Sequence, residues 1–209
     1  MAQIISIHPD NPQPRLIRQV AEALRDGAVV VYPTDSGYAI GCHLDDKPAV
    51  DRIRRIRGMD DKHMLTLMVR DLSELSTYAK VSNAQYRLMK NNTPGSYTFI
   101  LEATKEVPRR LQHPKRSTVG VRIPDHALAL ALLEELGEPL LSSTLILPEA
   151  HHPLTDVDEI HEHLESQVEI IVECGPVGLD PTTVIDLSHD EPVLLRRGKG
   201  DVAVFGLEE

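Results

Sequence analysis

The chain has 209 residues, two cysteines and a formal net charge of −10 at pH 7. This length is enough to bury a hydrophobic core without disulfides, and Cys42 and Cys174 show no CxxC or Cys/His ligand spacing, which argues against a disulfide framework and a zinc site. The acidic balance argues against a general nucleic-acid coat protein, although net charge does not say where the 22 Lys and Arg residues lie.

The ends and the hydropathy of the chain indicate its compartment. The first residues, MAQIISIHPDNPQP, carry no charged segment followed by a long apolar run, and the sequence contains no run of 18 apolar residues. We therefore expect a cytoplasmic protein that does not interact with a membrane.

Helical and extended patterns alternate along the chain without a linker or an internal repeat, which predicts one continuous domain over residues 1–209. Helices are predicted at 12–26, around 50–56, at 72–78, 83–89, 126–136 and 156–167. Strands are predicted at 29–32 and in HMLTLMV, SYTFILEA, STVGVRIP, PLLSSTLIL, VEIIVECG, TTVIDL, PVLLRRG and VAVFG. The total predicts a mixed α/β (α+β) domain with a sheet of about seven strands.

The segment VVVYPTDSG changes from apolar to polar at the end of a predicted strand. Pro33 cannot donate to a central strand ladder, so we expect the chain to leave the core there. Thr34, Asp35 and Ser36 would then offer hydroxyls and a carboxylate at the carboxyl end of a strand, where open α/β sheets often bind ligands. The alternative is an ordinary turn in which Asp35 and Ser36 satisfy their own backbone.

Two arginines stand out by position. On a helix, Arg57 lies between Val50 and Ile53 in angle, so it points inward and needs a phosphate or carboxylate partner, which is either a ligand or an internal ion pair. In STVGVRIP, period-2 alternation places Gly120 and Arg122 on the face opposite to that of the three β-branched residues Val119, Val121 and Ile123.

Other polar segments are less specific. Ser142, Ser143 and Thr144 interrupt an apolar strand and need hydrogen-bond partners, which either neighbouring strands or a ligand in a cleft would supply. LLRRGKGD combines cations with glycines but lacks P-loop spacing. No HExxH, GxSxG or comparable nucleophile pattern occurs, so zinc or covalent catalysis is not indicated.

Many of the cations fall in three short clusters, which are either solvated surface charges or one basic face for phosphate. They are Arg52, Arg54, Arg55 and Arg57; Arg109, Arg110, Lys115 and Arg116; and Arg196, Arg197 and Lys199.

Several segments keep an order and spacing that are specific together: YPTDSGYAIGC, RGMDDKHMLTLMV, TPGSYTFIL, TVGVRIP, EPLLSST, and PTTVIDL followed by LLRRG. In these segments the chain resembles the YrdC-like family, whose best-known members make threonylcarbamoyl-AMP, and within it the YciO branch. The resemblance implies a YrdC/RibB-like twisted mixed sheet with flanking helices and a concave basic cleft. It also implies binding of a nucleotide, or of the phosphates of double-stranded RNA or tRNA.

The same resemblance implies a set of ligand-binding residues, without assigning a catalytic one: Thr34, Arg57, Lys62, Thr98, Arg122, Ser142, Thr144 and Arg197. Thr34 would line the small-substrate end, Arg122 would face the cleft, and Arg197 would lie near phosphate. Arg57 and Lys62 would lie near the family's Lys-x-Arg nucleotide element. ATP with Mg²⁺ is expected only if a triphosphate is bound.

The chain also departs from the synthase pattern. RGM occupies residues 57–59 where synthases carry Lys-x-Arg, and Thr144, Leu145 and Ile146 replace Ser-x-Asn. Ser36 and Gly37 replace the usual Thr-Val. An isoleucine lacks the donors and acceptors of an amide, so these departures predict a retained fold and phosphate cleft with altered chemistry.

Three functional hypotheses remain open at the level of sequence. The first is a protein that binds nucleotide or structured RNA. The second is a threonylcarbamoyl-AMP synthase-like or adenylate-hydrolysing enzyme that acts in tRNA modification, with arginines stabilising phosphate charge. The third is an adaptor whose acidic exterior recruits an unknown protein partner, and unchanged partner recovery after neutralising that exterior would count against it.

Overall fold

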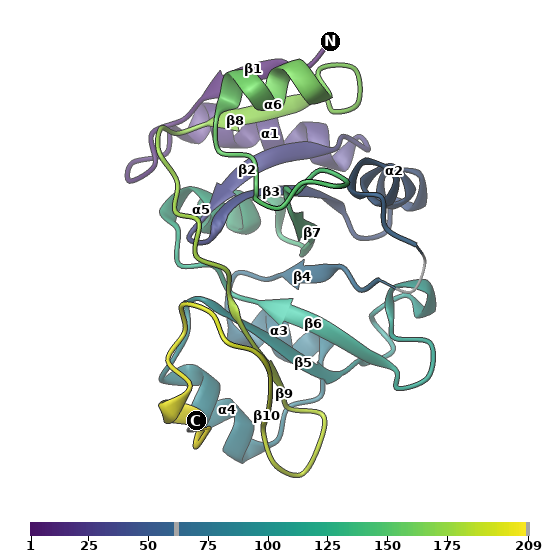
Figure 1. Cartoon of the computed structure of the whole chain (residues 1–209), viewed down its shortest axis with the longest axis vertical. Helices are drawn as coiled ribbons and strands as arrows, with labels where there is room; N and C mark the ends of the chain where they lie inside the picture. The colour runs from purple at the N-terminus through teal and green to yellow at the C-terminus, as the bar shows by residue number, and fades with distance from the viewer. Residues whose placement is uncertain (61–62, 208–209) are drawn as a thin grey trace.

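One mixed β-sheet of ten strands runs through the residues that the computed structural model describes, 1–60 and 63–207 (Figure 1). The strands are β1 (Gln3–Ser6), β2 (Val30–Thr34), β3 (Gly37–His43), β4 (Thr66–Met68), β5 (Tyr97–Glu102), β6 (Thr118–Arg122), β7 (Leu140–Thr144), β8 (Ile170–Glu173), β9 (Thr183–Asp186) and β10 (Val193–Arg196). Their order across the sheet is β1-β8-β2-β3-β7-β4-β6-β5-β9-β10.

Six α-helices and two short 3₁₀ helices accompany the described part of the sheet. They are α1 (Pro14–Arg25), α2 (Lys47–Arg57), α3 (Leu72–Tyr78), α4 (Asn83–Lys90), α5 (Ala127–Leu136), α6 (Val157–Leu164), η1 (Arg109–Leu111) and η2 (Ala203–Phe205). None of these helices is long and apolar enough to cross a membrane. The predicted mixed α/β class is confirmed.

The predicted number of about seven strands is lower than the ten of the sheet, and β1 and β3 were not identified from the sequence. β3 follows β2 after a two-residue turn, with Thr34 paired to Gly37, so YPTDSGYAIGC forms a hairpin. The predicted strand in VAVFG is wrong, since this segment contains η2. Val202 and Phe205 are both buried and lie three residues apart, which suits a 3₁₀ turn.

The helices divide between two hydrophobic clusters on opposite faces of β2. Val30 packs with Val20 of α1 and Leu132 of α5 in one cluster, whereas Val31 packs with Ile53 of α2 in the other. Successive strand residues point to opposite faces, so the continuous apolar run of β2 reflects burial on both sides.

Pro33 remains inside the sheet, which corrects the expectation that the chain leaves the core there. All five residues of β2 are buried, and β2 pairs with β3 along its whole length. β8, on the other side, pairs only with Val30 and Val31. Pro33 therefore lies where β2 has a strand neighbour on one side, a position at which a sheet tolerates proline.

Strand register gives the middle of the sheet two different faces. One cross-strand row, on β7, β4, β6 and β5, is buried core: Leu141, Leu67, Val121 and Phe99. The adjacent row on the same strands is smaller and more polar: Ser142, Thr66, Gly120 and Ile100. All four residues of the second row line a cavity, together with Arg122. The predicted alternation of STVGVRIP is thus confirmed.

We expect Gly41→Ala to lower the free energy of unfolding by about 1–3 kcal/mol, the usual cost of overpacking a core. A Cβ at this position of β3 would lie 2.9 Å from Cε1 of Tyr32 and 3.3 Å from the carbonyl oxygen of Leu141. Urea denaturation measures the effect.

Gly120→Ala is the matched control, because its Cβ would have no neighbour closer than 3.4 Å. It should change stability by less than about 1 kcal/mol. Equal losses in the two variants would contradict the packing argument.

Candidate anion-binding site

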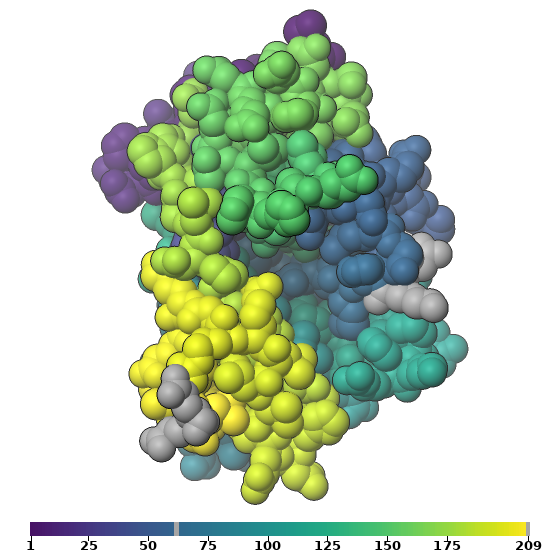
Figure 2. Space-filling view, in the orientation of Figure 1, coloured from purple at the N-terminus to yellow at the C-terminus, as the bar shows by residue number. Residues whose placement is uncertain are grey.

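A cavity of about 290 Å³ opens on the concave side of the sheet. Figure 2 shows this face hollowed between the green segment that precedes α6 and the yellow segment that contains β10. Three arginines line the cavity, Arg57, Arg122 and Arg196, and no Asp or Glu is among its described lining residues. Hydroxyl groups supply most of the other polar lining: Thr34, Ser36, Tyr38, Thr66, Thr98, Ser142, Ser143, Thr144 and Thr182.

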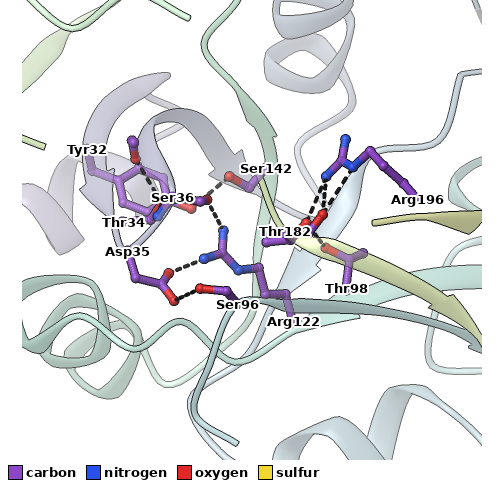
Figure 3. A network of polar contacts seen from close by, with 11 residues as sticks. Tyr32, Thr34, Asp35, Ser36, Ser96, Thr98, Arg122, Ser142, Thr182 and Arg196 are labelled. Atoms are coloured by element: carbon purple, nitrogen blue, oxygen red, sulfur yellow. Dashed lines mark hydrogen bonds and ion pairs between the residues drawn. The ribbon is translucent and has the colours of Figure 1, made fainter. Parts of the chain in front are cut away.

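Arg122, at the end of β6, is the most deeply buried of the three arginines, with only 5% of its surface exposed. Its Nη1 donates to Ser36 Oγ at 2.7 Å, and its Nη2 forms an ion pair with Asp35 (Figure 3). Its Nε is buried without a hydrogen-bond partner in the described structure. Burial lowers the pKa of Arg122, and Asp35 opposes this effect. One donor of a fixed guanidinium is therefore unused.

The turn between β2 and β3 positions the partners of Arg122. Thr34 Oγ1 donates to the carbonyl of Gly37 at 2.8 Å and accepts from the backbone N–H of Ser36 at 3.1 Å. Asp35 also accepts a hydrogen bond from Ser96 Oγ at 3.3 Å. The turn interpretation is therefore wrong for Asp35 and Ser36, whose side chains bond Arg122, and it is Thr34 that satisfies the backbone of the turn.

Arg57 reaches the cavity from the last residue of α2, as the helical angle predicted. Its Nε donates to Ser143 Oγ at 2.9 Å, and its Nη1 donates to the carbonyl of Ile146 at 2.6 Å. The helix ends there because Gly58 adopts the left-handed conformation, with φ of 66°. Partial burial lowers the pKa of Arg57.

Arg196 of β10 approaches from the opposite side of the cavity. Its Nε and Nη2 donate to the carbonyl of Thr182 at 3.0 and 2.9 Å, and Nη2 also donates to Thr182 Oγ1 at 2.9 Å. Thr182 Oγ1 in turn lies 2.8 Å from Thr98 Oγ1. Figure 3 shows this group across from the one around Arg122. Burial lowers the pKa of Arg196 as well.

Most of the residues predicted to bind a ligand meet at the cavity, although their binding role itself stays a prediction. Those that line it are Thr34, Arg57, Thr98, Arg122, Ser142 and Thr144. Arg197 is exposed and does not line it, and Lys62 lies outside the described residues. Sequence reasoning missed Arg196, because a register shift between Leu194 and Arg196 decides which arginine of the pair faces the cavity.

Of the residues in the three basic clusters, only Arg57 and Arg196 line the cavity. From the first cluster only Arg57 lines the cavity, since Arg52 pairs with Glu169 at 2.6 Å and Arg54 donates to loop carbonyls. From the third cluster Arg196 does so, and from the second none of the four residues. Arg122, outside all three clusters, is the central cation.

Tyrosine hydroxyls at the site stay neutral over the physiological range. Burial raises the pKa of Tyr38, which lines the cavity, to about 12. Burial also raises the pKa of Tyr32, whose hydroxyl lies 2.7 Å from Ser142 Oγ. Neither hydroxyl therefore adds a negative charge near the cavity.

Within the described residues, no group of three or more His, Cys, Asp or Glu could hold a metal ion. A divalent ion at this cavity would therefore need its ligands mainly from phosphate oxygens and water, as Mg²⁺ commonly does.

Residues 22–198 match the Sua5/YciO/YrdC family model, described as "Telomere recombination". The chain belongs to this family. It is 58% identical to YciO of Escherichia coli (strain K12) over 205 residues, which cover 98% of this chain and all of that protein. The crystal structure of E. coli YciO superposes with a TM-score of 0.94 over 98% of this chain and 100% of that chain.

More distant members of the Sua5/YciO/YrdC family include synthases. The threonylcarbamoyl-AMP synthase of Bacillus subtilis (strain 168) is 32% identical over 184 residues, which cover 87% of this chain and 53% of that protein. The structure of P. abyssi Sua5 complexed with L-threonine is 30% identical, with a TM-score of 0.86, over 94% of this chain and 58% of that chain.

We expect Asp35→Asn and Arg122→Gln each to destabilise the protein by about 3–5 kcal/mol, because either change leaves one buried charge without its partner. The double variant should lose less than the sum of the two single losses, as expected for residues in contact. Urea denaturation of all four proteins measures this coupling.

Arg55→Gln is the control for this cycle, because Arg55 is exposed on α2 and should leave stability unchanged within about 0.5 kcal/mol. Strictly additive losses for Asp35 and Arg122 would show that the two side chains do not interact energetically.

Proposed function

We propose that this protein binds the phosphate groups of a nucleotide in the cavity lined by Arg57, Arg122 and Arg196. The observation that carries the proposal is the charge of the cavity: three guanidinium groups and no carboxylate among its described lining residues, in a chain of net charge −10. Gathering like charges in a partly desolvated site is unfavourable without an anion. Arginine donors match phosphate oxygens in geometry and charge.

The size of the cavity favours a mononucleotide over a nucleic-acid duplex. Its volume of about 290 Å³ is close to the lower end, about 300 Å³, of the usual range for small-molecule sites. Duplex RNA is recognised mostly on its exterior, by contacts to phosphates and 2′-hydroxyls over an extended surface. Only Arg57 and Arg196 of the clustered cations line the cavity, so the cavity itself does not provide such a surface. Binding of double-stranded RNA or tRNA is therefore an outcome to be tested.

A second candidate function is an adenylate-forming or adenylate-hydrolysing enzyme of the synthase type. Its support is the similarity to the B. subtilis threonylcarbamoyl-AMP synthase and to P. abyssi Sua5 complexed with L-threonine. In such a reaction Arg57 and Arg122 would stabilise charge developing on phosphate, and ATP would enter with Mg²⁺. Ile146 weighs against it, because an apolar side chain lines the cavity where synthases carry an amide.

We expect Arg57→Gln and Arg196→Gln each to weaken ATP binding by about 1.5–3 kcal/mol, or roughly ten-fold or more, the usual worth of a hydrogen bond to a charged group. These two arginines are better test positions than Arg122, because among the described residues their side chains bond hydroxyls and carbonyls, whereas Arg122 forms an ion pair with Asp35. Calorimetric titration of ATP with Mg²⁺ measures the affinity, at two salt concentrations.

Arg55→Gln is the matched control on α2, because Arg55 does not line the cavity. Equal losses in Arg55→Gln and Arg57→Gln would contradict the proposed site. A parallel titration with a short RNA duplex tests the alternative ligand, and RNA binding that disappears with salt without any ATP signal would replace the nucleotide proposal.

Pyrophosphate release from ATP that depends on bicarbonate and threonine would establish the second candidate. If the protein binds ATP but releases no pyrophosphate, it binds nucleotide without synthase activity.

A further inference from the structure

The polar side chains that line the cavity are of only two kinds. Among the described lining residues they are hydroxyls and guanidiniums, without an Asn, Gln, Asp, Glu or His. Guanidiniums only donate, and hydroxyls rotate to donate or to accept. A fixed pair of donor and acceptor, which distinguishes one nucleobase edge from another, is missing from these side chains.

The backbone of the cavity floor and of the segment after β7 is also largely occupied. Each of the floor strands β7, β4, β6 and β5 pairs with a strand on both sides. Beyond β7, the N–H groups of Leu145 and Ile146 donate to the carbonyls of Tyr38 and Thr144, both at 3.0 Å. The carbonyl of Ile146 accepts from Arg57. These backbone groups are therefore already committed within the protein.

The apolar lining is rich in methionine and carries no directional contact. It includes Met59, Met64, Leu65, Met68 and Ile146. Methionine adapts to different partners and makes favourable contacts with aromatic rings. Every nucleobase has an aromatic face, so packing on such a wall tolerates any base.

We propose that the cavity recognises the polyphosphate of a nucleotide and is indifferent to its base, so that its ligand class is nucleoside triphosphates in general. The inference rests on the proposed function. The arginines then supply the affinity, while the apolar wall with Ile146 accepts purines and pyrimidines alike.

The test compares ATP, GTP, CTP and UTP, each with Mg²⁺, and inorganic tripolyphosphate by calorimetric titration of the full chain. The four nucleotides should bind with dissociation constants within about three-fold of one another, since their phosphates are identical. Tripolyphosphate should displace all four. Binding of ATP at least ten-fold tighter than the other three would overturn the inference and leave the proposed function intact. Binding of none of the five ligands to folded protein would overturn the proposed function itself.

An Ile146→Asn variant tests the position of the base. Ile146 is only half-buried, so the folded protein should accept the amide. The new donor and acceptor should separate the four nucleotides by about five-fold or more and leave the affinity for tripolyphosphate unchanged. Ile146→Val is the control, and this variant should still bind the four nucleotides with similar dissociation constants. An asparagine variant that still binds all four nucleotides equally would overturn the placement of the base on this wall.

Discussion

The ion pair between Arg122 and Asp35 is the interaction on which the site depends. It joins β6 to the turn between β2 and β3, although β7 and β4 lie between β3 and β6 in the sheet. Neighbouring strands are about 4.8 Å apart, so the pair reaches across the width of two intervening strands. It ties the turn to β6 and orients a guanidinium whose buried Nε–H has no partner among the described residues.

Small residues on the concave side leave room for the cavity. Gly120 and Thr66 lie in the same cross-strand row as Ser142, whereas the neighbouring row of the same strands is filled by Leu67 and Val121. The pairing register of these strands thus places a packed core on one face of the sheet and the polar floor of the cavity on the other. A shift of one residue in β6 would exchange the two faces and bury Arg122 in the apolar core.

The distribution of charge explains how an acidic member of the Sua5/YciO/YrdC family presents a cationic site. The net charge of −10 belongs to the whole chain, but the arginines that line the cavity come from α2, β6 and β10. Their field is strongest inside the cavity, where the low dielectric of the surrounding protein screens it less than bulk water does. Net charge alone therefore gives little information about the ligand of this fold.

Features whose cause lies in neighbouring residues were predictable from the amino-acid sequence. Hydrophobic periodicity placed the helices within a few residues, and period-2 alternation placed Arg122 opposite Val119 and Val121. The inward direction of Arg57 was likewise predictable, because it depends on residues within two turns of the same helix. The family was also predictable, because the order of the motifs that identify it is a property of the chain.

Features that depend on residues far apart in the chain became visible only in the folded protein. β3 was missed because its short apolar run gained its strand identity from pairing with β2 and β7. Arg196, rather than Arg197, lines the cavity because the register between β9 and β10 shifts at that point. Asp35 becomes the partner of Arg122 because strand order brings the turn after β2 near the end of β6, 87 residues further along the chain. Such contacts are set by strand order and register, which a local pattern of residues does not encode.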